Sequence, residues 1–199
     1  MHFRKKIANL FYSVGNAFES ARITLSRGNP NTGNPTDAKY ELPTYTRDEL
    51  VRKSRYLEKN SGQIRGVLRD LKVYGIGRGI YPNAKTDNQT WNKQAEDWFF
   101  RWSRHCDITN RFSWRECQAM ILRALVVDGE VFVIKTFNAF RVPKIQIIEG
   151  HRLMSPDHGA NPYIADGIEF DRYGRVKNYY FQIGEKFQTV KVPATAVLH

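Results

Sequence analysis

The sequence predicts an α+β fold in which N-terminal helices are followed by an antiparallel, β-rich region. Apolar residues recur at helical spacing as far as Val127, whereas runs typical of β-strands follow from Val131 onward. Capping-box patterns precede two of the helical stretches, and a glycine-containing turn joins two of the later apolar runs. Helices that come first, with strands after them, are typical of α+β proteins and not of alternating βαβ folds.

The first 45 residues are expected to lie outside the main domain. Residues 1–25 are predicted to form an amphipathic helix whose apolar face would rest on a neighbouring subunit or on the domain itself, rather than on a membrane. Residues 26–45 are rich in Pro, Gly, Asn and Thr, so an extended linker or arm is expected there. The candidate subunit-contact residues on the helix are Leu10, Phe11, Val14 and Phe18, with Ile7 on the same face.

The main domain is predicted to span residues 46–199 and to begin with two helices. Thr46 and Glu49 have capping-box spacing, which would place the start of the first helix. The apolar spacing predicts helices over 47–59 and 62–73, with a break between them at a glycine.

Three glycines follow the second helix, in the segment Gly75-Ile76-Gly77-Arg78-Gly79. A phosphate-binding loop would follow a strand and open a helix, whereas this segment follows a helix and leads to Pro82. We therefore interpret the glycines as a helix C-cap and tight turns. A strand-like stretch is expected up to the proline.

Two further helices are predicted over 90–106 and from Ser113 to about Val127, separated by a turn at 107–110. The first helix has aromatic side chains near one face, which we interpret as core and not as a base-stacking platform. A capping box of Ser113 and Glu116 begins the second. The expected core residues are Trp91, Ala95, Trp98, Phe99 and Trp102 on the first helix, and Trp114, Cys117, Met120, Ile121 and Ala124 on the second.

Strands are predicted in the remainder of the chain. The runs 131–137 and 142–148 are rich in β-branched residues. The runs 167–171 and 176–181 flank a turn that contains a glycine, so they predict a hairpin. A last strand is expected from Phe187 to Val192 and would be ended by Pro193.

The chain is strongly basic. Its 31 Lys and Arg residues exceed its 20 Asp and Glu residues, which gives a net charge of +11. Such a field favours nucleic acid, anionic lipid or acidic protein partners, although solvated surface charge is the alternative interpretation. The basic residues are spread along the sequence, and the short cluster Arg4-Lys5-Lys6 is the candidate nucleic-acid-binding segment.

The chain has two cysteines, Cys106 and Cys117, which are too few for a disulfide scaffold or a zinc site. We expect two reduced, partly buried thiols on two different helices of a cytoplasmic protein. No apolar run is long enough to span a bilayer, and polar residues interrupt any signal-peptide core, so a soluble protein without a leader is expected.

No catalytic, metal-binding or cofactor-binding residue is predicted. The five histidines form no zinc-protease motif, and the sequence has no GxSxG elbow. Glu149 and His151, followed by Asp157 and His158, offer an acid and a base, but such residues are common in turns at strand ends. The acidic pair in Asp128-Gly129-Glu130 is explained by a turn with a helix C-cap.

Seven segments resemble the lambda family of tailed-phage portal proteins, in the same order. Residues 145–153, IQIIEGHRL, are similar to that family's LQxIExxRL strand, and the DGE turn before Val131 is similar to its DGE-hydrophobic motif. The remaining segments are an Arg/Leu/Asn helix at 52–60, a VxGxG turn at 73–77, a Trp-rich helix closing on Cys106-Asp107, a GIExD hairpin at 166–181 and a VPAxxVxH close at 192–199.

The resemblance covers about residues 46–199 and implies the N-terminal, wing-side region of a portal protein, incomplete at its C-terminus. Portal proteins are structural subunits of a ring, usually of twelve copies, at one capsid vertex of the virion. The ring is the head–tail connector and the channel for double-stranded DNA packaging and ejection. It is expected to assemble in the host cytoplasm and to contact the terminase, capsid and head-completion proteins. The alternative function is a basic, sequence-independent nucleic-acid-binding module.

Overall fold

The computed structural model describes residues 43–156, 161–183 and 188–199, and these belong to one compact unit, Leu42–His199. Helices come first and antiparallel strands afterwards, which confirms the α+β prediction. The helices are α3 (Thr44–Asn60), α4 (Gly62–Leu71), α5 (Gln89–Ser103) and α6 (Trp114–Val127). The strands are β1 (Val131–Phe137), β2 (Pro143–Glu149), β3 (Ile164–Ala165), β4 (Ile168–Phe170), β5 (Val176–Ile183), β6 (Gln188–Pro193) and β7 (Val197–Leu198).

The predicted capping box at the start of the first helix is wrong. Helix α3 begins at Thr44 after Pro43, whose φ of −61° and ψ of 153° give an extended entry, and no side chain caps this end. The Thr44 hydroxyl instead donates a hydrogen bond to Asp166, and Glu49 accepts one from Arg52, so the predicted partner of Thr46 is engaged elsewhere.

The break between the first two helices lies where it was predicted. The Ser61 side chain accepts a hydrogen bond from the Ile64 N–H and so begins α4. The helix then ends in a π-helical turn, Lys72–Ile76.

Gly77 closes that turn with a φ of 54°, which confirms the C-cap interpretation of the glycines. The strand-like stretch expected after them is wrong. At Ile80 the backbone N–H donates to the Gln118 side chain, and the carbonyl accepts from Gln118 and from the Trp114 indole. Side chains of α6 therefore take the backbone hydrogen bonds that a strand partner would need.

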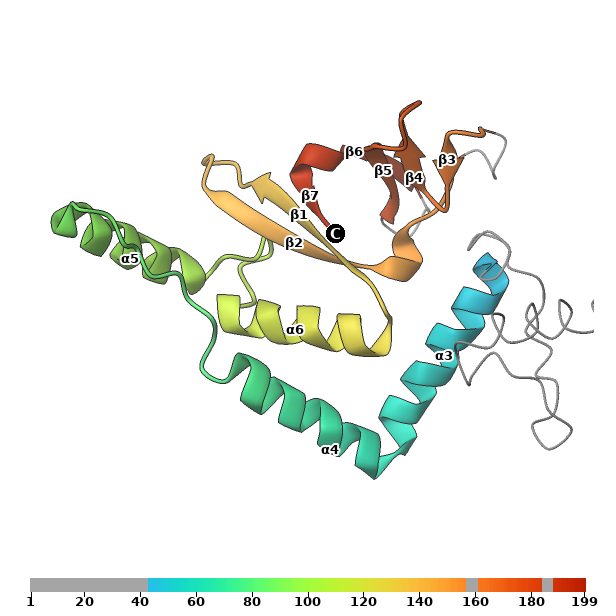
Figure 1. The fold of residues 1–199 in the computed structure, drawn as a ribbon, viewed down its shortest axis with the longest axis horizontal. Helices are drawn as coiled ribbons and strands as arrows, with labels where there is room; N and C mark the ends of the chain where they lie inside the picture. The colour runs from blue at the N-terminus through green and yellow to red at the C-terminus, as the bar shows by residue number, and fades with distance from the viewer. Residues whose placement is uncertain (1–42, 157–160, 184–187) are drawn as a thin grey trace, which may run out of the picture. The chain divides into compact units, whose positions relative to one another are not determined.

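The aromatic side chains of α5 differ in burial. Phe99 and Trp102 contact Trp114 of α6, with ring centroids 6.0 and 5.8 Å apart, and these three are partly buried. Trp91 and Trp98 are exposed, at 53% and 50%, so assigning them to the core was wrong. In Figure 1 much of α5 extends beyond the strands, which leaves its outer aromatics without a core to cover them.

Helix α6 begins as predicted, because both hydrogen bonds of the Ser113–Glu116 capping box are present. It lies on one face of the β1–β2 hairpin, and the second sheet lies on the opposite face (Figure 1). The first sheet has the strand order β2-β1-β7 and the second has β3-β4-β5-β6. Antiparallel pairing of β4 with β5 confirms the predicted hairpin.

The alternation of side chains along β1 builds two cores from one strand. Val133 faces α6 and packs with Ile145 and the two cysteines. Phe132, on the opposite face, is fully buried against the second sheet, where Phe181 is also fully buried.

The two cysteines differ from the prediction in burial and in placement. Cys106 follows the end of α5 and belongs to no helix, whereas Cys117 lies on α6. Both thiols are fully buried and free, and their Sγ atoms lie 3.8 Å apart. Packing against β1 and β2 buries both sulfurs completely.

Candidate functional site: the open edge of strand β2

Strand β2 is an edge strand, and only part of its edge is covered. On one side it pairs with β1, from the pair of Val131 and Glu149 to the pair of Phe137 and Pro143. On the open side, the Ile145 N–H donates to the Cys106 carbonyl and the Ile145 carbonyl accepts from Ile108. The segment after α5 therefore covers the edge at this one position.

Beyond Ile145 the edge is open. Successive residues of a strand direct their backbone groups to opposite sides, so Ile147 and Glu149 point the same way as Ile145, away from β1. Among the described residues, no partner bonds the backbone N–H or carbonyl of Ile147 or the N–H of Glu149. The Glu149 carbonyl begins the 3-10 turn Gly150–Arg152, so two donors and one acceptor line this part of the edge.

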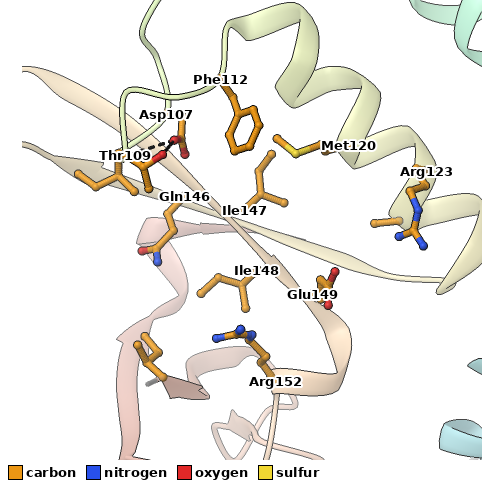
Figure 2. Close-up of a pocket in the computed structure, with 13 residues that line it drawn as sticks. Asp107, Thr109, Phe112, Met120, Arg123, Gln146, Ile147, Ile148, Glu149 and Arg152 are labelled. Carbon is orange, nitrogen blue, oxygen red and sulfur yellow. Dashed lines mark hydrogen bonds between the residues drawn. The ribbon is translucent and has the colours of Figure 1, made fainter. Parts of the chain in front are cut away.

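A groove of about 560 Å³ runs along this edge (Figure 2). Phe112 and Met120 form its wall on the side of α6, with Ile147 between them and the strand. Ile148 and Arg152 lie on the other side, where Ile183 of β5 also contributes. The groove therefore combines apolar walls with a polar strand edge, which is the chemistry that binds an extended peptide.

Arg152 is an unpaired cation in the lining of the groove. Its side chain is exposed, and it forms no hydrogen bond or ion pair with any other described residue. In Figure 2 its guanidinium lies beside Ile148, within the groove. An acidic side chain placed there would gain a cationic partner.

A cluster of ion pairs closes one end of the groove. Arg55 of α3 donates two hydrogen bonds to Asp128, of 2.7 and 2.9 Å, and approaches Glu149 at 3.4 Å. Arg123 of α6 donates to both carboxylate oxygens of Glu58, the shorter bond being 2.5 Å, and lies 3.7 Å from Asp128. The pairs connect α3, α6 and the end of the β1–β2 hairpin.

Burial makes Asp128 the centre of this cluster. Its side chain is 3% exposed, and a carboxylate so buried needs a charged partner. The hydrogen bond to Asp128 raises the pKa of Arg55 above its usual value, which keeps the guanidinium charged. Asp128 is also the C-cap of α6, as the sequence predicted for this turn, but its ion pair with Arg55 was not foreseen.

The possible acid and base noted in the sequence do not form a catalytic arrangement in the described residues. The Glu149 carboxylate lies 3.1 Å from His151 and is shared with Arg55, so it serves an ion-pair network. Asp157 and His158 lie outside the described residues. Nor does the described part of the chain contain a group of acidic, His or Cys residues that would hold a metal ion.

The residues selected from the sequence as binding candidates lie outside the part that the structure describes. They are Arg4, Lys5, Lys6, Leu10, Phe11, Val14 and Phe18, so both the DNA contact and the subunit contact remain predictions. Within the described residues, no helix is long and apolar enough to cross a membrane.

Sequence reasoning missed both the groove and the ion-pair cluster. Arg55 and Asp128 are 73 positions apart, and no local pattern links them. The one available signal was the polar pair Asp128 and Glu130 between a helix and a buried strand, where a charge needs a partner.

Comparison with protein families gives a match over most of the chain. The model of the family described as "Phage portal protein, lambda family" matches residues 28–199. The match begins before residue 46 and so takes in most of the 26–45 segment, which the motif resemblance had left out. No curated protein matches the chain.

Proposed function

Because the chain belongs to the lambda family of phage portal proteins, we propose that it is a subunit of the portal ring at one capsid vertex. The ring would form the channel for double-stranded DNA packaging and ejection and would dock the terminase motor. The observation that carries this proposal is the family match over residues 28–199. Twelve copies is the ring size we propose.

The surface of the first two helices supports a ring subunit. Neither α3 nor α4 contains a buried residue, although both carry large apolar side chains. Leu57 and Val67 are more than half exposed. Apolar surface of this kind marks interaction sites, and neighbouring copies in a ring would cover it.

The chemistry of the described residues suits a structural role. The buried carboxylate of Asp128 is neutralised by two arginines, which tie it to α3 and α6. The family is one of structural proteins, and the chemical work of DNA packaging would belong to the terminase.

The positive charge suits a protein that contacts DNA without reading its sequence. Contacts from lysine and arginine go to phosphates, weaken with salt and show no base preference. We propose Arg4, Lys5 and Lys6 for such contacts, and the apolar face that carries Leu10 and Phe11 for contact with a neighbouring subunit.

Negative-stain electron microscopy of the full-length product of this reading frame tests the proposal. Rings with a central hole would support it and give the subunit number. Monomers or small oligomers at high protein concentration, across several salt conditions, would contradict it.

A second function, a nucleic-acid-binding module, is favoured by one observation. Trp91, Trp98 and Phe100 are half exposed on α5, and the rings of Trp98 and Trp102 are stacked with centroids 6.5 Å apart. Exposed aromatics can stack on the bases of single strands. Fluorescence anisotropy with a single-stranded oligonucleotide separates the two functions. A base-stacking module predicts that Trp98→Ala weakens binding by about 1–3 kcal/mol, whereas a ring subunit predicts no change.

A further inference from the structure

We propose that the open edge of β2 binds residues 37–42 of a neighbouring copy as an added β-strand. The inference rests on the proposed ring, because a ring places a second copy beside each subunit. It goes further by naming the surface and the segment that meet. The order of the extended sheet would be the added strand, β2, β1 and β7.

The backbone of β2 supplies the first argument. Ile147 presents an N–H and a carbonyl, and Glu149 presents an N–H, that no described residue bonds. They lie in line with Ile145, whose two groups are bonded to the 106–108 segment. An incoming strand would satisfy all three groups. Edges of this kind are where proteins accept a strand from another chain.

The sequence of residues 37–42, Asp-Ala-Lys-Tyr-Glu-Leu, supplies the second argument. Apolar residues alternate with charged ones, so a strand would place Ala38, Tyr40 and Leu42 on one face. The other face would carry Asp37, Lys39 and Glu41. No proline interrupts the six residues.

The two faces match the two walls of the groove. The apolar face would pack on Phe112 and Met120, and the charged face would bring Asp37 and Glu41 to the side of Arg152. Arg152 is unpaired among the described residues, so the pairing costs no existing contact.

The backbone at Pro43 supplies the third argument. Its ψ of 153° shows that the chain enters α3 in an extended conformation. A residue before proline is itself biased towards extended conformations, which applies to Leu42. The family match begins at residue 28, so the segment belongs to the family region of the chain.

Cross-linking between two differently tagged full-length chains tests the proposal. One chain carries Lys39→Cys and the other carries Gln146→Cys, two positions that would share the face of the sheet on the side of Arg152, and the two are assembled together and oxidised. Both native thiols are fully buried, so they do not compete. A disulfide band that joins the two tags is the expected result. The matched control, Thr189→Cys on the exposed edge strand β6, should give no such band.

Charge reversal provides a second readout. Arg152→Glu should lower the yield of cross-copy disulfide about threefold, as expected for a partly exposed ion pair, without changing the unfolding transition. Replacing both Asp37 and Glu41 by Lys in the partner should restore the yield.

The possible outcomes test the strand contact and the ring separately. Rings without a cross-copy band would overturn the strand contact and leave the ring intact. A cross-copy band without rings would support the strand contact and contradict the ring.

Discussion

Arg55 and Asp128 are joined by two parallel hydrogen bonds that connect the middle of α3 to the end of α6. Both guanidinium–carboxylate distances, 2.7 and 2.9 Å, are those of a strong charged pair. Because α3 contains no buried residue, this pair and the neighbouring Glu58–Arg123 pair are main attachments of the helix to the domain. Loss of either ion pair should therefore weaken the attachment of the whole helix α3 to the domain.

Replacing Arg55 with Met should destabilise the protein by about 3 kcal/mol, because it leaves the buried Asp128 carboxylate with only the more distant Arg123. Urea denaturation of the full chain measures the change. The matched control is Arg52→Met on the same helix, which removes an exposed pair with Glu49 and should cost less than about 1 kcal/mol. Equal losses in the two variants would contradict the structural role assigned to Asp128.

Gly167→Ala should destabilise the protein by about 2 kcal/mol or more. Its φ is +81°, and an added Cβ would lie 2.7 Å from the backbone nitrogen of Met154. Gly174 has a similar φ of +78° but open space around the Cβ position, so Gly174→Ala should cost only about 1 kcal/mol. Thermal unfolding compares the two. If they cost the same, the close approach of Met154 to this turn is not as described.

Glu169 should contribute an acid-sensitive part of the stability. Hydrogen bonding with Lys191, and then with Tyr180, lowers its pKa from 4.5 to about 2. The stabilisation is present above pH 4.5 and is lost as the pH falls towards 2. Denaturation across this range should show a weaker pH dependence for Glu169→Gln.

Two lysines allow a matched comparison at that carboxylate. Lys191 lies 2.9 Å from Glu169 and Lys177 lies 3.8 Å away. Lys191→Met should therefore remove more of the acid dependence than Lys177→Met. The opposite order would show that Lys191 is not the main partner.

Cys106 and Cys117 should be unreactive in the folded protein. Both are fully buried, and the hydrogen bond with Cys106 together with burial raises the pKa of the Cys117 thiol. A thiol-reactive chromogenic disulfide should label neither cysteine in native buffer and both in urea. Rapid labelling without denaturant would contradict their burial.

Local patterns predicted most of the secondary structure. The capping box at Ser113 and the β-rich run at 131–137 are each set by residues close together in sequence, and both were confirmed. The same capping pattern at Thr46 was wrong, because the helix starts directly after Pro43 and Glu49 bonds Arg52 instead.

Features that depend on distant residues were not predicted. The pairing of Arg55 with Asp128 joins two helices that are far apart in sequence. The open edge of β2 depends on which strand lies beside it, and the short strand β7 that completes the sheet order comes from the last residues of the chain. Exposure of Trp98 depends on where α5 lies relative to the strands, which spacing along the helix does not encode.

Negative-stain electron microscopy of the full-length product shows directly whether the chain assembles into a ring. A subunit of a portal ring should appear as uniform rings with a central hole, and counting their rotational symmetry should give twelve copies. Monomers or irregular small oligomers at every salt concentration would contradict the ring. That result would favour the alternative function, in which the exposed aromatics of α5 bind nucleic acid.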